Sequence, residues 1–281
     1  MELIRNISQL VQLDLKLVDE ITREITDTEI PYQVTYGEFQ FGGWHTAALY
    51  VPQGQDDSDA IVRDGKAVPT ALLDKLPATR GFLAQLDLDY FTVRIARNDV
   101  DSWLWEHRDY MELDQGMERC RLHVPLVTND LAVIQFESHA VHMARGWLWK
   151  LDPTSSHAVS NTGGSGRIHL ILDCYMMNSI RCMVKSQHLD KDHIFPLPKL
   201  LETERTELLA QASQLFMDEG QETAEQSLLK TFHRFDLGES SSYDLLVQLY
   251  RNVGSKDYEQ HWLKEQNIRL FNREKLEVIE A

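Results

Sequence analysis

The chain has 281 residues, of which 43% are hydrophobic and 9% aromatic, and its formal net charge at pH 7 is −16. This length allows one large β-barrel domain, or a barrel with a smaller module, and no apolar run approaches the ~18–20 residues that a membrane helix requires. The acidic balance makes nucleic acid a poor partner, because phosphate recognition depends on a basic surface.

The first segments read as a short strand over residues 2–10 and an amphipathic helix over 13–25. The N-terminus lacks a basic start and a long apolar stretch, so we expect a cytoplasmic protein. A strand follows over 45–51, a Gly/Asp/Ser-rich loop over 52–60 and a helix over 71–86 that Pro77 interrupts. The three cysteines lack C-x-x-C spacing and are expected to be reduced thiols. They are Cys120, Cys174 and Cys182.

Between residues 89 and 178 the sequence becomes a series of short β-rich stretches separated by turn residues, which is typical of a barrel or jelly roll. Residues 162–167, TGGSGR, lack the lysine of a phosphate-binding loop and are predicted to form a hairpin turn. After the prolines of 195–200 the chain is mostly helical. We therefore predict two domains, a β domain over 1–190 with an N-terminal helical flank and a helical domain over 191–281.

A candidate metal motif lies at the end of the strand SWLWE. His107 and Asp109 are two residues apart, so in an extended chain both side chains point to the same face. His157, 48 residues later and after another predicted strand, completes a set of two histidines and one carboxylate. Such a set suits iron(II) and leaves positions open for a chelating 2-oxo acid and dioxygen, although other divalent metals could occupy it. Taken alone, an H-x-D motif is a weak signal.

Three further side chains are candidates for binding carboxylates. Arg167 opens the strand RIHLILD, ten residues after His157, and a guanidinium can pair with a carboxylate through two hydrogen bonds. Arg121 and His123 share one face of the strand RCRLHVPLV. The alternative is that Arg167 lies in an exposed turn and that the other two face solvent.

With these residues in place, the chain resembles the aspartyl/asparaginyl β-hydroxylase-like branch of the iron(II), 2-oxoglutarate oxygenases, and within it the bacterial free-proline hydroxylases that act at carbon 3 or 4. The resemblance covers nearly the whole chain. It is carried by HRDYMELD (107–114), RLHVPL (121–126), HMARGWLWKLD (142–152), SSHAVSN (155–161) and RIHLILD (167–173).

The resemblance implies a mainly β fold with helical flanks, a double-stranded β-helix (cupin-like jelly roll) plus a C-terminal helical module. It implies His107, Asp109 and His157 as ligands of Fe(II), and Arg167 as the anchor of the 2-oxoglutarate tail. It also implies that Arg121 and His123 contact carboxylates of the cosubstrate or the substrate.

Three residues are weaker candidates for substrate contacts. Arg97 matches an arginine of the proline hydroxylases, whereas Trp103 and Trp105 stand where smaller aliphatic residues are usual in that family. Alternating tryptophans are more often part of a core than of a substrate platform. Structural roles are expected for His139, His142 and His169, and Tyr110, Asp152 and Asp173 are candidate partners of the ligands.

The sequence thus predicts a 2-oxoglutarate-dependent dioxygenase that hydroxylates an unactivated C–H of a free amino acid, with Fe(II), 2-oxoglutarate and O2. Proline or a ring homologue is the first candidate substrate, and an acyclic amino acid such as lysine or a residue within a peptide is the alternative. A non-catalytic metal-binding cupin or a ligand sensor is the alternative of another class. We expect no nucleic-acid or membrane partner, and a homodimer is an assembly that the sequence permits.

Overall fold

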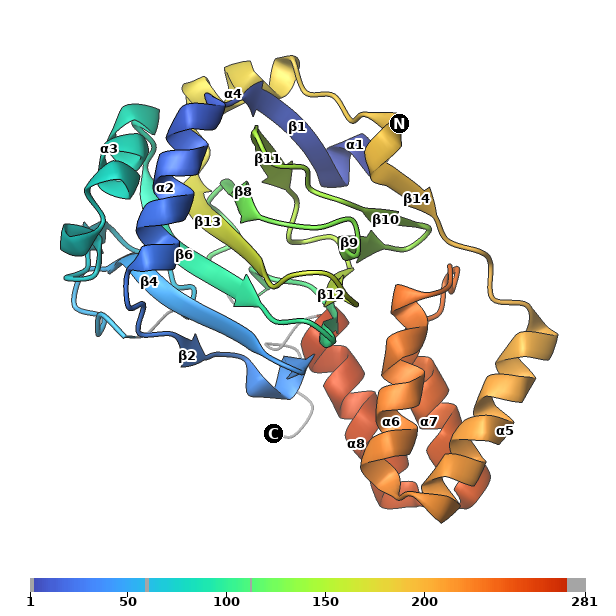
Figure 1. Cartoon of the computed structure of the whole chain (residues 1–281). Coiled ribbons are helices and arrows are strands. Elements are labelled where there is room, and N and C mark those ends of the chain that lie inside the picture. Colours follow the sequence, from blue (N-terminus) through green and yellow to red (C-terminus); the bar gives the residue numbers. More distant parts are fainter. Residues whose placement is uncertain (1–2, 59–60, 112, 272–281) are drawn as a thin grey trace.

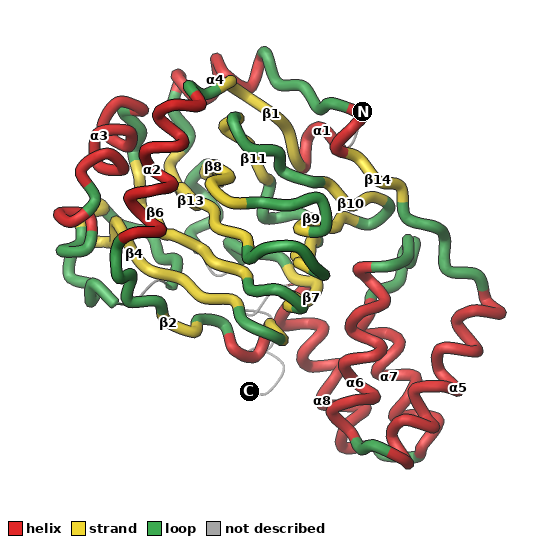
Figure 2. Tube along the Cα trace, in the orientation of Figure 1, coloured by secondary structure: helices red, strands yellow, loops and turns green. Residues whose placement is uncertain are grey.

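The computed structural model describes residues 3–58, 61–111 and 113–271. Its β-strands form two sheets whose pairings are antiparallel throughout (Figures 1 and 2). The first sheet contains β1 (Ile7–Gln12), β2 (Gln33–Val34), β4 (Trp44–Pro52), β5 (Ala67–Pro69), β6 (Tyr90–Asn98), β8 (Arg119–Val127), β11 (Trp147–Leu151) and β13 (Arg167–Tyr175). Its order is β1-β11-β8-β13-β6-β4-β2, with β5 paired to β4.

The second sheet has the order β14-β10-β9-β12-β7-β3. Its strands are β3 (Gln40–Phe41), β7 (Ser102–His107), β9 (Ala132–Phe136), β10 (His139–Val141), β12 (His157–Asn161) and β14 (Ile194–Pro196). Apolar side chains from both sheets pack between them, among them Trp149 and Ile171 from the first sheet and Leu104 and Ile134 from the second. Two antiparallel sheets around one core are the architecture of a jelly roll, so the predicted fold is confirmed.

Helices α2 (Leu15–Asp27) and α3 (Pro77–Leu86) cover the outer face of the first sheet (Figure 1). The side chain of Asp14 caps α2 by accepting a hydrogen bond from the Lys16 amide at 2.9 Å. Val18 and Ile21 of this helix pack into the same core as Leu122 of β8. The first sheet is therefore buried on both faces. The short helices α1 (Leu3–Asn6) and α4 (Asn178–Lys185) were not predicted.

The predicted hairpin at residues 162–167 is wrong. The segment connects β12 to β13, which belong to different sheets, so it crosses between sheets instead of joining two paired neighbours. The glycine-rich composition serves a sharp change of direction, and Gly164 adopts a positive φ of 73°.

The C-terminal part forms a group of helices beside the barrel (Figure 1). They are α5 (Glu202–Asp218), α6 (Gln221–Leu229), α7 (Ser242–Val253), α8 (Lys256–Gln266) and a π-helical turn at Asn267–Phe271. They share one apolar core, which also includes Trp105 of β7. The division into domains at residue 190 stays a prediction; β14, beyond that residue, still pairs with β10. In the part of the chain that the structure describes, no helix is long and apolar enough to cross a membrane.

Candidate active site

The candidate metal motif lies at one end of the second sheet, where β7 and β12 run side by side. His107 and His157 are directly opposite each other in the ladder. Asp109 follows the end of β7, and its amide donates a hydrogen bond of 2.7 Å to the carbonyl of Pro153, in the turn before β12. The potential ligand atoms of these two histidines and the aspartate all lie within 4.8 Å of one another.

Each imidazole is held in one tautomer. His107 Nδ1 lies 2.6 Å from the carbonyl oxygen of Trp105, and His157 Nδ1 lies 2.9 Å from that of Ser155. Because a carbonyl can only accept, each Nδ1 carries the proton and each Nε2 keeps its lone pair. The two Nε2 atoms lie 3.8 Å and 3.9 Å from the carboxylate oxygens of Asp109.

The protonation states also suit a cation. Burial lowers the pKa of His107 and lowers that of His157 to about 3, so both rings are neutral at pH 7. Burial alone would raise the pKa of Asp109, but the positive charge of Arg121 outweighs it with help from the two rings, and the pKa lies well below its usual range. Two neutral imidazoles and one carboxylate are the ready form of a metal-ligand set.

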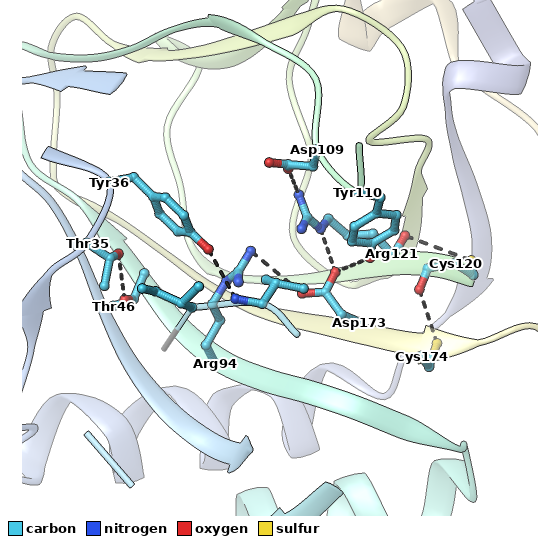
Figure 3. Close-up of polar contacts among 12 residues, drawn as sticks. Thr35, Tyr36, Thr46, Arg94, Asp109, Tyr110, Cys120, Arg121, Asp173 and Cys174 are labelled. Carbon is cyan, nitrogen blue, oxygen red and sulfur yellow. Dashed lines mark hydrogen bonds and ion pairs between the residues drawn. The ribbon is translucent and has the colours of Figure 1, made fainter. Parts of the chain in front are cut away.

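Arg121 pairs with two carboxylates of the chain (Figure 3). Its guanidinium pairs with Asp109, and its Nε donates to Asp173 Oδ1 at 2.6 Å. The hydroxyl of Tyr110 donates to the same oxygen, and the guanidinium lies 5.0 Å from the centre of the Tyr110 ring. The structure thus gives Arg121 to the protein's own acids, where the sequence predicted contacts with an external carboxylate.

The three residues suggested as partners of the metal ligands lie in two different parts of the site. Tyr110 and Asp173 belong to the group around Arg121, whereas Asp152 stabilises the turn before β12 by accepting from the Thr154 amide at 3.0 Å.

The His/Asp group opens into a cavity of about 280 Å³ between the two sheets. Its walls are partly apolar, with Leu104, Ile134, Val159 and Ile171, and the remainder includes several cationic side chains. A small, largely enclosed space with a few polar groups is typical of a small-molecule site.

Arg167 lines this cavity and is only 1% exposed. Its guanidinium contacts the ring of His169 at 2.9 and 3.1 Å, and its Nη1 has no hydrogen-bond partner within the described chain. No carboxylate of a described residue lies within 4.0 Å of it. Burial lowers its pKa to about 9, so it is still a cation at neutral pH.

His123 also lines the cavity, and neither of its ring nitrogens has a partner among the described residues. Burial holds its pKa well below the usual range, and the charge of Arg167 adds to this, so the ring is neutral. A buried polar group without a partner is costly. Arg167 and His123 therefore present unmet hydrogen-bonding capacity to the cavity.

The predicted substrate contact at Arg97 is wrong in position. Its guanidinium pairs with Asp99 at 3.0 Å and stacks over the Tyr32 ring at 4.8 Å, away from the cavity. The arginine that lines the cavity from β6 is Arg94, three residues earlier and therefore on the opposite face of the strand. Arg94 is 4% exposed, and its Nη2 lies 3.6 Å from Asp173 Oδ2.

Trp103 and Trp105 do not reach the cavity either. Trp105 is buried in the core of the C-terminal helices, and Trp103 lies against that core, with the amine of Lys230 4.0 Å from its ring centre. Their role as candidate substrate contacts is thus corrected to packing between barrel and helices. His139 and His142 do not line this cavity either, and their structural roles stay a prediction.

Sequence reasoning missed the contribution of the C-terminal helices. Ile268, in the final π-helical turn, lines the cavity, and the neighbouring Arg269 donates to the Glu38 carbonyl at 2.9 Å and stacks on Phe39 at 4.5 Å. Ile268 and Arg269 lie more than 100 positions from the motif, and no signal in the sequence ties them to it.

Comparisons with known proteins agree with this picture. The aspartyl/asparaginyl β-hydroxylase family matches residues 14–176. An L-proline cis-3-hydroxylase of a Streptomyces species is 26% identical over 255 residues, covering 84% of this chain and 83% of that protein. An L-proline cis-4-hydroxylase of Rhizobium meliloti is 30% identical over 146 residues, covering 50% of this chain and 51% of that protein.

Similar solved structures include an oxidoreductase of the 2OG-Fe(II) oxygenase family from Burkholderia pseudomallei, with a TM-score of 0.38 and 15% identity over 56% of this chain and 78% of that one. A prolyl-4-hydroxylase of Pseudomonas putida has a TM-score of 0.36 and 16% identity over 61% and 92%. The family match spans more than half of the sequence. The chain therefore belongs to the aspartyl/asparaginyl β-hydroxylase family and is, as predicted, a 2-oxoglutarate-dependent dioxygenase that uses iron(II) and O2.

Proposed function

We propose that this protein hydroxylates an unactivated C–H bond of a free amino acid, with proline or a ring homologue as the first candidate. The observation that carries the proposal is the cavity itself, where two neutral imidazoles and a carboxylate face the same space as Arg167, whose Nη1 has no described hydrogen-bond partner. The proline hydroxylation named for both relatives supports the choice of substrate.

In this proposal His107, Asp109 and His157 hold the iron. Their Nε2 lone pairs and ionised carboxylate fit a divalent cation, and three protein ligands leave positions open for other ligands. When bound, iron(II) with 2-oxoglutarate and O2 supplies the oxidising power for C–H hydroxylation. Asp109 is kept ionised and oriented by Arg121, so the carboxylate is ready before the metal arrives.

Arg167 is proposed to bind the distal carboxylate of 2-oxoglutarate, because its buried charge has no described counter-ion and a planar guanidinium matches a carboxylate. His123, with both ring nitrogens unpartnered, is proposed to donate a hydrogen bond to the cosubstrate from the same wall. The apolar side chains Leu104, Ile134 and Val159 would exclude water around the substrate.

The lining favours proline over lysine. A lysine side chain would require an acidic pocket, whereas the acids that line the cavity among the described residues are the exposed Glu38 and the proposed ligand Asp109. A metal-holding cupin without oxygenase activity has no use for an unpaired buried guanidinium such as Arg167, which is costly to the fold. The alternative that the experiment must distinguish is hydroxylation of a residue within a peptide.

The test is succinate release under iron(II), O2 and 2-oxoglutarate with a panel of free amino acids and proline-containing peptides, followed by mass spectrometry. We expect proline or a ring homologue to gain 16 mass units in step with succinate. The His157→Ala variant should lose both signals. No turnover above the uncoupled background, with metal binding by His157→Ala still normal, would overturn the proposal. The homodimer and the cytoplasmic location stay predictions.

A further inference from the structure

The strand that ends in the metal motif has an irregularity next to that motif. In the ladder between β7 and β12, His107 is opposite His157 and Leu104 is opposite Val159. Three steps along β7 thus match two steps along β12, so β7 contains one extra residue, a β-bulge. Leu104 and His107 both face the cavity, and the two residues between them, Trp105 and Glu106, both face the C-terminal helices.

Glu106 is a buried acid that the proposed chemistry does not use. It is 3% exposed, and its Oε2 accepts hydrogen bonds from the amide and hydroxyl of Ser242, at 3.0 and 3.1 Å. Its Oε1 accepts from the hydroxyl of Ser156 at 2.9 Å, and its backbone carbonyl accepts from the hydroxyl of Tyr243 at 2.6 Å. One residue therefore connects the first turn of α7 with the segment that precedes His157.

The two imidazoles depend on the same connections. His107 donates to the carbonyl of Trp105, whose indole is buried in the core of the helices. His157 donates to the carbonyl of Ser155, the residue next to Ser156. The carbonyl that fixes His107 belongs to Trp105, which precedes Glu106, and the backbone of Glu106 is hydrogen-bonded to Tyr243. The carbonyl that fixes His157 belongs to Ser155, which precedes Ser156, and the hydroxyl of Ser156 is hydrogen-bonded to the Glu106 carboxylate. In Figure 2, β7 lies on the side of the barrel that faces these helices.

We propose that Glu106 is a positioning residue, whose carboxylate joins the N-terminal turn of α7 to both histidine-bearing segments and thereby sets the orientation of the two imidazoles toward the metal. The C-terminal helices are then part of the metal site and not only an attached module. This inference rests on the proposed function, since it requires that His107 and His157 bind a metal.

The test uses the full chain and cobalt(II), whose affinity and visible absorption spectrum report on the ligands without turnover. In Glu106→Gln one of the two acceptor oxygens becomes an amide nitrogen, which cannot accept the hydrogen bonds that Ser242 or Ser156 now donates, so the segment before His157 loses part of its support. Changes in groups that orient metal ligands typically cost ~10–100-fold in affinity. We expect about 10-fold weaker cobalt(II) binding and an altered spectrum. Tyr243→Phe, which removes the donor to the Glu106 carbonyl, should change both in the same direction.

The matched control is Glu225→Gln, the same exchange inside the helical core. Glu225 Oε1 accepts from Tyr250 Oη at 2.5 Å and from Trp262 Nε1 at 2.9 Å, far along the chain from the metal motif. We expect this variant to melt at a lower temperature while it binds cobalt(II) as the wild type does.

The outcomes separate the hypotheses. If Glu106→Gln does not fold, Tyr243→Phe and Ser242→Ala decide the question. Wild-type cobalt(II) affinity and spectrum in the folded variants would overturn the positioning role, as would an equal loss in Glu225→Gln. If the wild-type protein itself binds no cobalt(II), the proposed metal site fails, and that result is distinct from a failure of the Glu106 proposal.

Discussion

Two buried arginines that line the same cavity differ in their partners, so the same substitution should have opposite effects on stability. Arg121 pairs with Asp109 and Asp173, whereas Arg167 has no described carboxylate within 4.0 Å. Replacing each by methionine removes the charge and keeps much of the volume. The buried charge of Arg167 has no described counter-ion and destabilises the folded state, whereas the charge of Arg121 is paired. Arg167→Met should therefore stabilise the metal-free protein, and Arg121→Met should destabilise it.

The magnitudes follow from the surroundings. Burial lowers the pKa of Arg167 from 12.5 to about 9. At about 1.36 kcal/mol per unit this shift corresponds to a cost of at most ~5 kcal/mol for the buried charge. Contacts with His169 and imperfect packing of methionine offset part of the gain, so we expect ~1–3 kcal/mol of stabilisation. Arg121→Met leaves Asp109 without its cation and leaves Asp173 with Arg94 alone, so it should cost ~3–5 kcal/mol.

In Arg167→Met the affinity for 2-oxoglutarate should fall although the stability of the metal-free protein rises. Losing one partner of a buried charge pair costs ~2–5 kcal/mol, which is a loss of about 30-fold or more in affinity for 2-oxoglutarate. The assays are urea unfolding of the metal-free variants and calorimetric titration of 2-oxoglutarate into cobalt(II)-loaded protein. The reasoning is refuted if both variants lose stability to the same extent, or if Arg167→Met binds 2-oxoglutarate as tightly as the wild type.

Three further predictions concern the metal, the pH and the backbone. His157→Ala should weaken cobalt(II) binding by more than the ~100-fold upper range seen for outer partners, and an unchanged titration would contradict its role as a ligand. In the metal-free protein six histidines have lowered pKa values, so the unfolded chain takes up protons near pH 6.5 that the folded chain refuses. Stability should therefore fall as the pH drops from about 6.5 toward 4, by up to ~1.4 kcal/mol per pH unit for each histidine, and a flat urea midpoint across this window would be the opposite result. The six histidines with lowered pKa values are His107, His123, His142, His157, His169 and His233. Gly42→Ala should lower the unfolding free energy by ~2–4 kcal/mol, because φ is +90° there and a Cβ would lie 2.4 Å from the Asp101 carbonyl oxygen, whereas the control Gly37→Ala, with nothing within 4 Å, should cost under ~1 kcal/mol in the same melts.

The grouping of the candidate metal ligands could be predicted because it depends on short-range geometry. His107 and Asp109 are neighbours in one segment, and His157 begins a strand that a jelly roll places beside the first one. Arg167 followed from the same topology, since it opens the next strand and enters the cavity from the facing sheet. None of these placements needed knowledge of distant packing.

Arg97 was misplaced because β6 gives no sign of which face is inward. The strand is covered on its outer face by helices, and its residues from Tyr90 to Ala96 are all buried. Both faces are therefore covered and each carries one arginine, so the side-chain pattern does not show which face lines the cavity. A choice between Arg94 and Arg97 then depends on register with β13, which only the assembled sheet defines. The prediction for Trp103 and Trp105 was wrong for another reason. The bulge in β7 shifts the alternation of inward and outward side chains by one residue just before His107.

The net charge of −16 does not determine which ligands the cavity can bind. It argues against nucleic acid, but at physiological ionic strength charges more than ~8 Å apart in solvent are largely screened, whereas a group that is 1% exposed, such as Arg167, is screened far less. Inside the cavity Arg121 is neutralised by two acids, and Arg167 keeps its charge without a described counter-ion. The local balance at the cavity wall is therefore cationic in an acidic protein. In the proposed function it is this local charge, and not the charge of the chain, that selects a dicarboxylate such as 2-oxoglutarate as the ligand.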